Sequence, residues 1–220
     1  LGAHDSRGQY RVLRRHRLFL SNVPLTAPGL CTCAGQPVGV LNAADLCVYG
    51  PGRFLPELAC DASMCGGYWP YKSRNLNSHI LPLCDPRAGL HAKIFGNQPW
   101  PVANFLGLLE DRDARHLFSS AKVCPSVSEP HSTDLGWDII ERPFKVLSSG
   151  GFCVSDHVDE IREVFDEDEL PTAKTAAEFI KLVKHYIAKP YEQIPIMAKG
   201  RKKVLLDHTY FDRVAQMLDQ

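Results

Sequence analysis

The 220-residue sequence lacks several features that would assign it to a class at once. No apolar run approaches the roughly 20 residues needed to span a bilayer, and no signal-peptide core follows the basic N-terminus. Lys and Arg number 25, as do Asp and Glu, so no net charge favours nucleic acid or an anionic membrane. There is no internal repeat and no low-complexity tract. The first residue is Leu rather than Met, so we expect the natural start to lie upstream.

The eight cysteines also lack a metal-binding spacing. No C-x-x-C pair occurs, and Cys31-Thr32-Cys33 is too tight for an ordinary zinc knuckle. Cys124 and Cys153 lie inside apolar runs and are expected to be small buried residues. We therefore expect reduced thiols, no metal and a cytoplasmic location.

The order of apolar runs predicts an α/β fold. Residues 1–58 are irregular, with short strands only at 17–20 and 37–41, and form either a separate segment or the remnant of a partner domain. Residues 59–193 alternate strands with helices, which predicts a Rossmann-like parallel sheet flanked by helices. The strands are expected at 62–65, 93–96, 122–124 and 152–155, and the helices at 110–120, 139–149, 158–165 and, behind a Thr175–Glu178 capping box, up to Pro190. A closing helix is predicted over 194–218, within a C-terminal unit of residues 194–220.

Ligands of such sheets bind beyond the carboxyl ends of the strands, where three polar segments fall. In the first, the paired glycines Gly66 and Gly67 allow backbone N–H groups to approach an anion, and Lys72 adds charge. In the second, Glu129 and His131 follow a strand and suit acid–base chemistry or binding of hydroxyl groups. The alternatives are a plain turn for the glycines and a capping or solvated glutamate for Glu129.

The third segment is the start of the helix predicted at 139–149. Glu141, Arg142 and Lys145 lie in its first turns, where free N–H donors and the helix dipole attract phosphate, and Gly150 ends it. The alternative is a solvated basic face. Asp111-Arg112-Asp113 matches a D-x-D metal motif, but acidic residues also favour the first turn of a helix, which explains them without a metal.

In this order, the segments resemble a known family. The sequence from Arg142 to Phe152 resembles the R-x-F-E-x-L-A-x-G-G-F signature of spore-maturation-type glycosyltransferases, relatives of the group-1 family. The tail from His208 to Arg213 is similar to the family's H-T-Y-x-x-R segment, and Gly66 with Lys72 is similar to its first loop. The resemblance covers residues 61 to the end and implies the nucleotide-sugar-binding domain of a GT-B type enzyme.

The resemblance also implies roles for residues. Gly67, Lys72 and Arg142 would face the donor diphosphate, Gly150 would pack behind it, and Glu129 and His131 would lie near the sugar. No metal or other cofactor is expected, because basic residues stabilise the leaving diphosphate. The acceptor would be a glycan, a lipid or a protein.

Several residues depart from the family pattern. Trp137 and Lys145 occupy the positions of the family's two glutamates, of which the second holds the ribose, and Gly67 replaces an arginine. Lysine cannot accept hydrogen bonds from ribose hydroxyls. Either Glu141 does so from one turn earlier, or the donor is held differently, or the domain no longer turns over.

The leading prediction is therefore a glycosyltransferase that uses a nucleotide diphosphate-sugar. The alternative is a non-catalytic module, truncated or degenerate, that binds a nucleotide, a glycan or a protein. Residues before 61 are too few for a partner domain on the order of 100 residues, and a second copy of the chain in a homo-oligomer is one way to complete the cleft. Nucleic-acid binding by the basic residues 11–17 is disfavoured against a plain basic arm.

Overall fold

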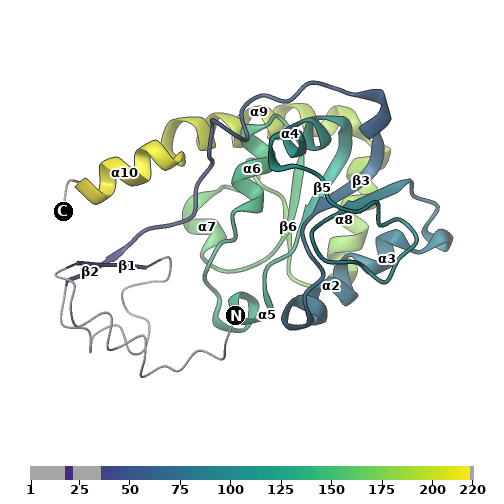
Figure 1. Ribbon diagram of the computed structural model, residues 1–220, viewed down its shortest axis with the longest axis horizontal. Coiled ribbons are helices and arrows are strands. Elements are labelled where there is room, and N and C mark those ends of the chain that lie inside the picture. The colour runs from purple at the N-terminus through teal and green to yellow at the C-terminus, as the bar shows by residue number, and fades with distance from the viewer. Residues whose placement is uncertain (1–17, 22–35, 219–220) are drawn as a thin grey trace.

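The computed structural model describes residues 18–21 and 36–218. A five-stranded, fully parallel sheet of order β4-β3-β5-β6-β7 forms its centre (Figure 1). Its strands are β3 (Cys60–Cys65), β4 (Ala92–Phe95), β5 (Ala121–Ser126), β6 (Cys153–Asp156) and β7 (Thr172–Ala173). A separate parallel pair consists of β1 (Leu18–Ser21) and β2 (Gln36–Gly39).

Helices cover both faces of the five-stranded sheet, as predicted for a Rossmann-like α/β fold. One layer contains α4 (Asp111–Ser120), α6 (Arg142–Ser148), α7 (Ile161–Val164) and α9 (Pro190–Asp207). The other layer contains α2 (Ser73–His79), α3 (Leu81–Cys84) and α8 (Ala176–Ala188). Two further helices are α5 (Pro130–Leu135) and α10 (Tyr210–Leu218). Short 3-10 turns lie at Pro56–Leu58, Pro70–Lys72 and Pro86–Ala88.

The apolar core divides between the two faces because neighbouring strand residues point in opposite directions. Cys124 and Cys153 pack with α4 and α6 on one face, whereas Val123 and Val154 pack with α2 and α8 on the other. All four side chains are at most 1% exposed. The prediction that Cys124 and Cys153 are buried is thus confirmed, and both are free thiols.

Most of the predicted elements are present, but three helices differ. The helix predicted from 139 begins at Arg142, because Asp138 has a left-handed φ of 77° and the N–H groups of Asp138 and Ile139 donate to the carboxylate of Glu160. The helix predicted from 158 begins at Ile161. The prediction of one helix over 194–218 is wrong.

Two helices replace that single one. Pro190 occupies the first turn of α9, where its missing N–H costs nothing, so it both ends α8 and starts the next helix. The chain then breaks at His208, because Thr209 and Asp212 exchange hydrogen bonds: the Thr209 N–H donates to Asp212 at 2.7 Å and the Asp212 N–H to Thr209 Oγ1 at 3.3 Å. This reciprocal cap begins α10.

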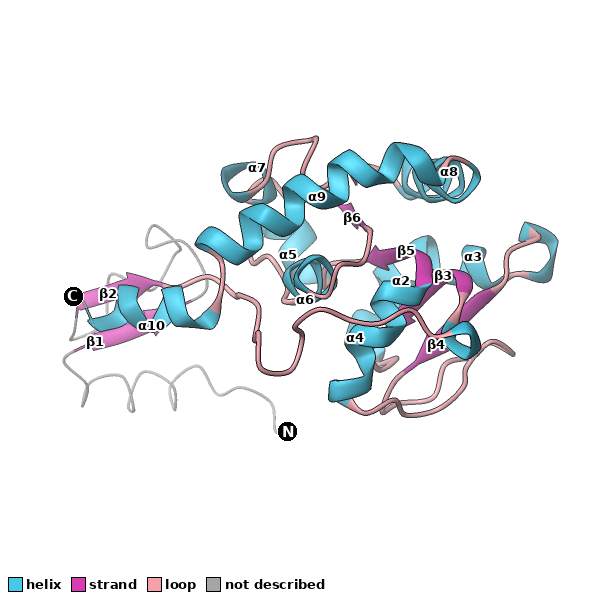
Figure 2. Ribbon diagram, turned by 90° about the horizontal axis from the view of Figure 1, so that it is seen from above, coloured by secondary structure: helices cyan, strands magenta, loops and turns pink. Residues whose placement is uncertain are grey.

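Part of the segment predicted to be irregular packs on the sheet domain. Ala44 and Tyr49 are buried in the core cluster shared with α4 and α6. The Gly52 N–H donates to the Ser149 carbonyl at 2.9 Å. The pair β1–β2 lies instead at the end of the molecule where α10 projects (Figures 1 and 2). The domain boundaries after residues 58 and 193 remain predictions, and residues 1–17, with their basic cluster, lie outside the described residues.

In the described ranges, no helix has the length and apolar character to cross a bilayer.

Candidate functional site

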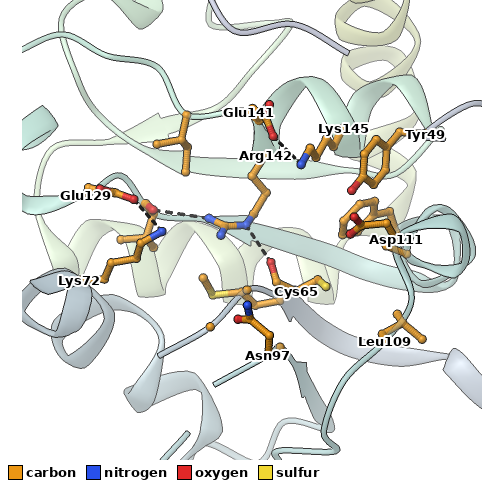
Figure 3. A pocket seen from close by; sticks show the side chains of 18 of the residues that line it. Tyr49, Cys65, Lys72, Asn97, Leu109, Asp111, Glu129, Glu141, Arg142 and Lys145 are labelled. Carbon is orange, nitrogen blue, oxygen red and sulfur yellow. Dashed lines mark hydrogen bonds and ion pairs between the residues drawn. The ribbon is translucent and has the colours of Figure 1, made fainter. Parts of the chain in front are cut away.

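A pocket of about 630 Å³ opens at the carboxyl ends of β3, β4 and β5 (Figure 3). The loops after these strands form its floor, and the starts of α4 and α6 form a wall. Asn42 and Tyr49, from the segment before the sheet, complete the lining. Residues from six parts of the chain therefore meet at the edge where a parallel α/β sheet binds its ligands.

The first loop, Gly66-Gly67, is tightly packed. The Gly66 N–H donates to the Phe95 carbonyl at 2.8 Å, and the Gly66 carbonyl accepts from Trp100 Nε1 at 2.8 Å. A methyl group on Gly67 would lie 2.5 Å from Oδ1 of Asn97, closer than carbon and oxygen can approach. A side chain at this position would therefore have to displace the Asn97 side chain, so the turn is closely packed.

Arg142 extends from the first turn of α6 across the pocket (Figure 3). Nε faces the Cys65 carbonyl at 3.4 Å and Nη1 faces the Val127 carbonyl at 3.5 Å, which are long for charge-assisted hydrogen bonds. Burial lowers the pKa of Arg142. Among the described residues, none of the carboxylates lies within ion-pair distance of it. The guanidinium is therefore an enclosed cation without a matched anion, which is unfavourable unless a ligand supplies one.

Lys72 and Glu129 form an ion pair on the side of the pocket away from Tyr49, with 2.6 Å between Nζ and Oε1 (Figure 3). His131, in α5, has 3.0 Å between Nε2 and Oδ2 of Asp138 and 3.6 Å between Nδ1 and Oε2 of Glu129. Its side chain is 53% exposed, and it is not among the residues that line the pocket. His131 thus lies at the outer rim, within hydrogen-bond distance of Asp138 but not of Glu129.

On the α6 wall, Lys145 pairs with Glu141 at 2.5 Å, and Tyr210 Oη donates to the other oxygen of Glu141 at 2.5 Å. Burial raises the pKa of Glu141, but the hydrogen bonds from Lys145 and Tyr210 outweigh burial, so its pKa is lowered. The Lys145 ammonium also lies 4.7 Å from the ring centre of Tyr49, in cation–π range. Glu141 is therefore an ionised acceptor at the pocket wall.

Asp111 lies in the first turn of α4, as predicted, and also lines the pocket. Burial and the nearby Asp111 carboxylate raise the pKa of Tyr49 strongly, so the phenol stays protonated. No cluster of metal-ligating side chains is found within the described residues.

A buried network supports the loop after β5. Asp156, 3% exposed, accepts the Ser128 N–H at 2.9 Å and the Ser128 hydroxyl at 2.9 Å. Asn75 Nδ2 donates to the Ser128 carbonyl at 3.0 Å. Burial raises the pKa of Asp156, and the bonds from Ser128 oppose that rise. Val127 and Glu129 are held at the pocket by this network.

The structure brings together seven of the predicted site residues: Gly66, Gly67, Lys72, Glu129, Glu141, Arg142 and Lys145 all line the pocket. His131 lies at its rim, and Gly150 lies behind α6, where a φ of 83° ends the helix. Sequence reasoning missed Asn42, Tyr49 and Tyr210. No local motif marks Asn42 or Tyr49, and the family-like segment that contains Tyr210 gives no sign of contact with the pocket, because only the crossing of distant segments places these residues at the site.

Residues 74–219, well over half of the chain, match the family model described as glycosyl transferase-like. The comparison with curated proteins gives no match.

Three solved structures share the fold. A sucrose-phosphate synthase from Thermosynechococcus elongatus has a TM-score of 0.68 and 12% identity, over 100% of this chain and 63% of that one. HepE from Anabaena, solved in complex with UDP-glucose, has a TM-score of 0.67 and 12% identity, over 98% of this chain and 68% of that one. The trehalose-6-phosphate synthase OtsA has a TM-score of 0.67 and 8% identity, over 96% of this chain and 61% of that one. The chain thus spans less than two thirds of the first and third of these proteins, and the fold is what it shares with all three. By the family match, the chain belongs to the glycosyl transferase-like family.

Proposed function

We propose that the pocket around Arg142 binds a nucleoside diphosphate-sugar, from which a sugar is transferred to an acceptor hydroxyl. The unmatched charge of Arg142 is the observation that carries this proposal, because a diphosphate would supply the missing anion. The pocket volume of about 630 Å³ suits a ligand of this size. HepE, which has the same fold, was solved with UDP-glucose, so uridine is the first nucleoside to test.

The two ends of the pocket differ in character, which orients the donor. Tyr49 and Leu109 offer aromatic and apolar surface at one end for the nucleoside, while Lys72 and Glu129 lie at the other (Figure 3). The diphosphate would lie between these ends, over Arg142. Lys145 cannot accept hydrogen bonds from ribose hydroxyls, so in this proposal the Glu141 carboxylate on the same wall accepts them.

In the transfer step, the acceptor oxygen bonds to the anomeric carbon as the bond from that carbon to the diphosphate breaks. Arg142 and Lys72 stabilise the negative charge that develops on the leaving diphosphate. In this proposal Glu129 receives the proton that the acceptor hydroxyl loses, and His131, with 3.6 Å between Nδ1 and Oε2 of Glu129, passes it on to solvent.

A second candidate is a binding module without turnover. The Lys145–Glu141 pair favours it, because one charge of each sign is already neutralised at the wall where a donor must bind. This candidate shares nucleotide binding with the first and differs only in sugar transfer.

Calorimetric titration with UDP, GDP and ADP tests the proposal on the wild-type chain and on Arg142→Gln. We expect micromolar binding of one nucleotide, weakened at least about tenfold in the variant, since a charge-assisted hydrogen bond contributes about 1.5–3 kcal/mol. Arg112→Gln, which removes the same charge from the exposed face of α4, should bind like the wild type.

If none of the three nucleotides binds, the donor-site proposal is wrong. Binding of a nucleotide together with no consumption of any nucleotide-sugar, with or without added acceptors, would instead favour the binding module.

A further inference from the structure

The segment His208–Arg213 closes around the chain that precedes the sheet. Arg213, 6% exposed, donates from Nε to the Leu41 carbonyl at 3.0 Å and from Nη2 to the Asn42 carbonyl at 3.3 Å. Nη2 also lies 2.8 Å from Nδ1 of His208, which accepts when the imidazole is neutral. One buried guanidinium therefore joins the C-terminal helix to residues 41 and 42.

Backbone hydrogen bonds extend this contact. The Ala44 N–H donates to the His208 carbonyl at 2.9 Å, and the Tyr210 N–H donates to the Ala44 carbonyl at 3.0 Å. From the same segment, Asn42 Nδ2 donates to the Ile139 carbonyl at 2.8 Å. We call this arrangement of residues 41–44 with His208–Arg213 the clamp. It fixes the start of α10 relative to the residues that lead into α6.

The clamp brings Tyr210 to the pocket wall. Its hydroxyl donates to Oε1 of Glu141, and Lys145 binds Oε2, each at 2.5 Å. Each carboxylate oxygen keeps a further acceptor site, and 40% of the Glu141 side chain is exposed. The free acceptor sites of Glu141 thus have a fixed direction that Lys145 alone, on a flexible stem, would not impose.

We propose that Tyr210 is a positioning residue of the donor site: held by the clamp, its hydroxyl orients Glu141 to accept both hydroxyl groups of the donor ribose. The proposal rests on the donor-binding function proposed above. It gives a role to the segment His208–Tyr210, which contains none of the pocket residues predicted from the sequence.

The test compares a nucleoside diphosphate with its 2′,3′-dideoxy form, by calorimetry on the full chain. The probe is UDP, or GDP or ADP if the wild type binds that instead. We expect the wild type to favour the hydroxylated ligand by about tenfold or more, because hydrogen bonds to a charged acceptor are strong. Tyr210→Phe should lose most of this preference, and Glu141→Gln nearly all of it.

Phe211→Ser is the matched control, since Phe211 is the next residue of α10 and is 67% exposed. It should keep the wild-type preference. If Tyr210→Phe weakens both ligands equally, or leaves the ratio unchanged, Tyr210 does not position Glu141 and the inference is overturned. Should Tyr210→Phe fail to fold, an undiminished preference in Glu141→Gln overturns it equally.

These outcomes separate the two proposals. A wild type that binds no nucleoside diphosphate contradicts the donor-binding function itself. A wild type that binds the nucleotide, with a ratio independent of Tyr210, contradicts only the positioning role.

Discussion

The guanidinium of Arg142 lies directly against the α-carbon of Gly66: a methyl group on that carbon would be 2.9 Å from Nη2. Gly66→Ala should therefore displace the guanidinium. Because the displaced atoms end a flexible side chain, folding should change little, while affinity for the nucleoside diphosphate falls about tenfold, the loss of roughly one charge-assisted hydrogen bond. Calorimetry and thermal unfolding measure the two effects.

Gly89→Ala is a control that should change stability and leave nucleotide affinity unchanged. Gly89 has open space around it but a φ of 67°, so alanine there should cost about 1 kcal/mol of stability through backbone strain. Its affinity for the nucleotide should equal that of the wild type. Unchanged affinity in Gly66→Ala would show that the ligand does not use the observed position of Arg142.

Glu129→Gln should separate binding from turnover. The substitution frees Lys72 from its ion pair, so the ammonium becomes available to phosphate and nucleotide affinity should rise by a few-fold. If Glu129 takes the acceptor proton, sugar transfer should fall by about 100-fold or more. Asp134→Asn, which breaks the exposed Arg74–Asp134 pair on the neighbouring helix, should alter neither quantity. Undiminished transfer in Glu129→Gln would exclude it as the base.

Acidification should destabilise the clamp through His208. Burial, followed by the charges of Arg213 and Lys203, lowers the pKa of His208 from 6.5 to about 4. Between these values the unfolded chain binds more protons than the folded one, so stability falls as the pH falls from 6.5 to 4 and is unaffected above 6.5. The loss should be at most about 3 kcal/mol.

Urea unfolding at pH 7 and pH 4.5 measures this loss. His208→Gln keeps a hydrogen-bond acceptor for Arg213 but cannot be protonated, so its acid-induced loss should be smaller than that of the wild type. His91→Gln, an exposed position before β4, should keep the full loss. Equal pH dependence in the wild type and His208→Gln would rule out this role for His208.

The capping box of α8 offers a test that concerns stability alone. Thr175 Oγ1 accepts the Glu178 N–H at 3.2 Å, and the Glu178 carboxylate accepts the Thr175 N–H at 3.2 Å. Thr175→Ala should lower the free energy of unfolding by about 1 kcal/mol. Thr175→Ser, which retains the cap, should lose much less. Because α8 is on the face of the sheet away from α6, neither variant should change nucleotide affinity.

Local signals were sufficient for four strands of the sheet but not for β7 or for every helix. Short apolar runs ending in polar loops predicted β3 to β6, and the Thr175–Glu178 pair predicted the start of α8. The start of α6 could not be placed, because the carboxylate that holds Ile139 out of the helix is Glu160, 21 residues away. The Thr209–Asp212 cap has a local signature, Thr-x-x-Asp, but it lies within a long polar pattern that predicts one continuous helix.

The pocket shows the same division. Residues at strand ends, such as Gly66 and Glu129, could be predicted because a parallel sheet gathers strand ends at one edge. Tyr49 and Tyr210 could not, since they are 161 positions apart in sequence and meet the pocket through contacts with different neighbours. The partner of Lys145 was within reach of sequence reasoning, because Glu141 is its i−4 neighbour on a helix.

The clamp has a mechanical consequence. The segment that leads into the five-stranded sheet and the segment that follows α9 meet at one point, where Ala44 and Thr209 form a parallel β-bridge. A shift of the start of α10 relative to the sheet would therefore move residues 41–44 as well, because Ala44 and Thr209 are joined. Asn42 and Tyr210 are hydrogen-bonded to Ile139 and Glu141, so such a shift would also change the shape of the pocket wall.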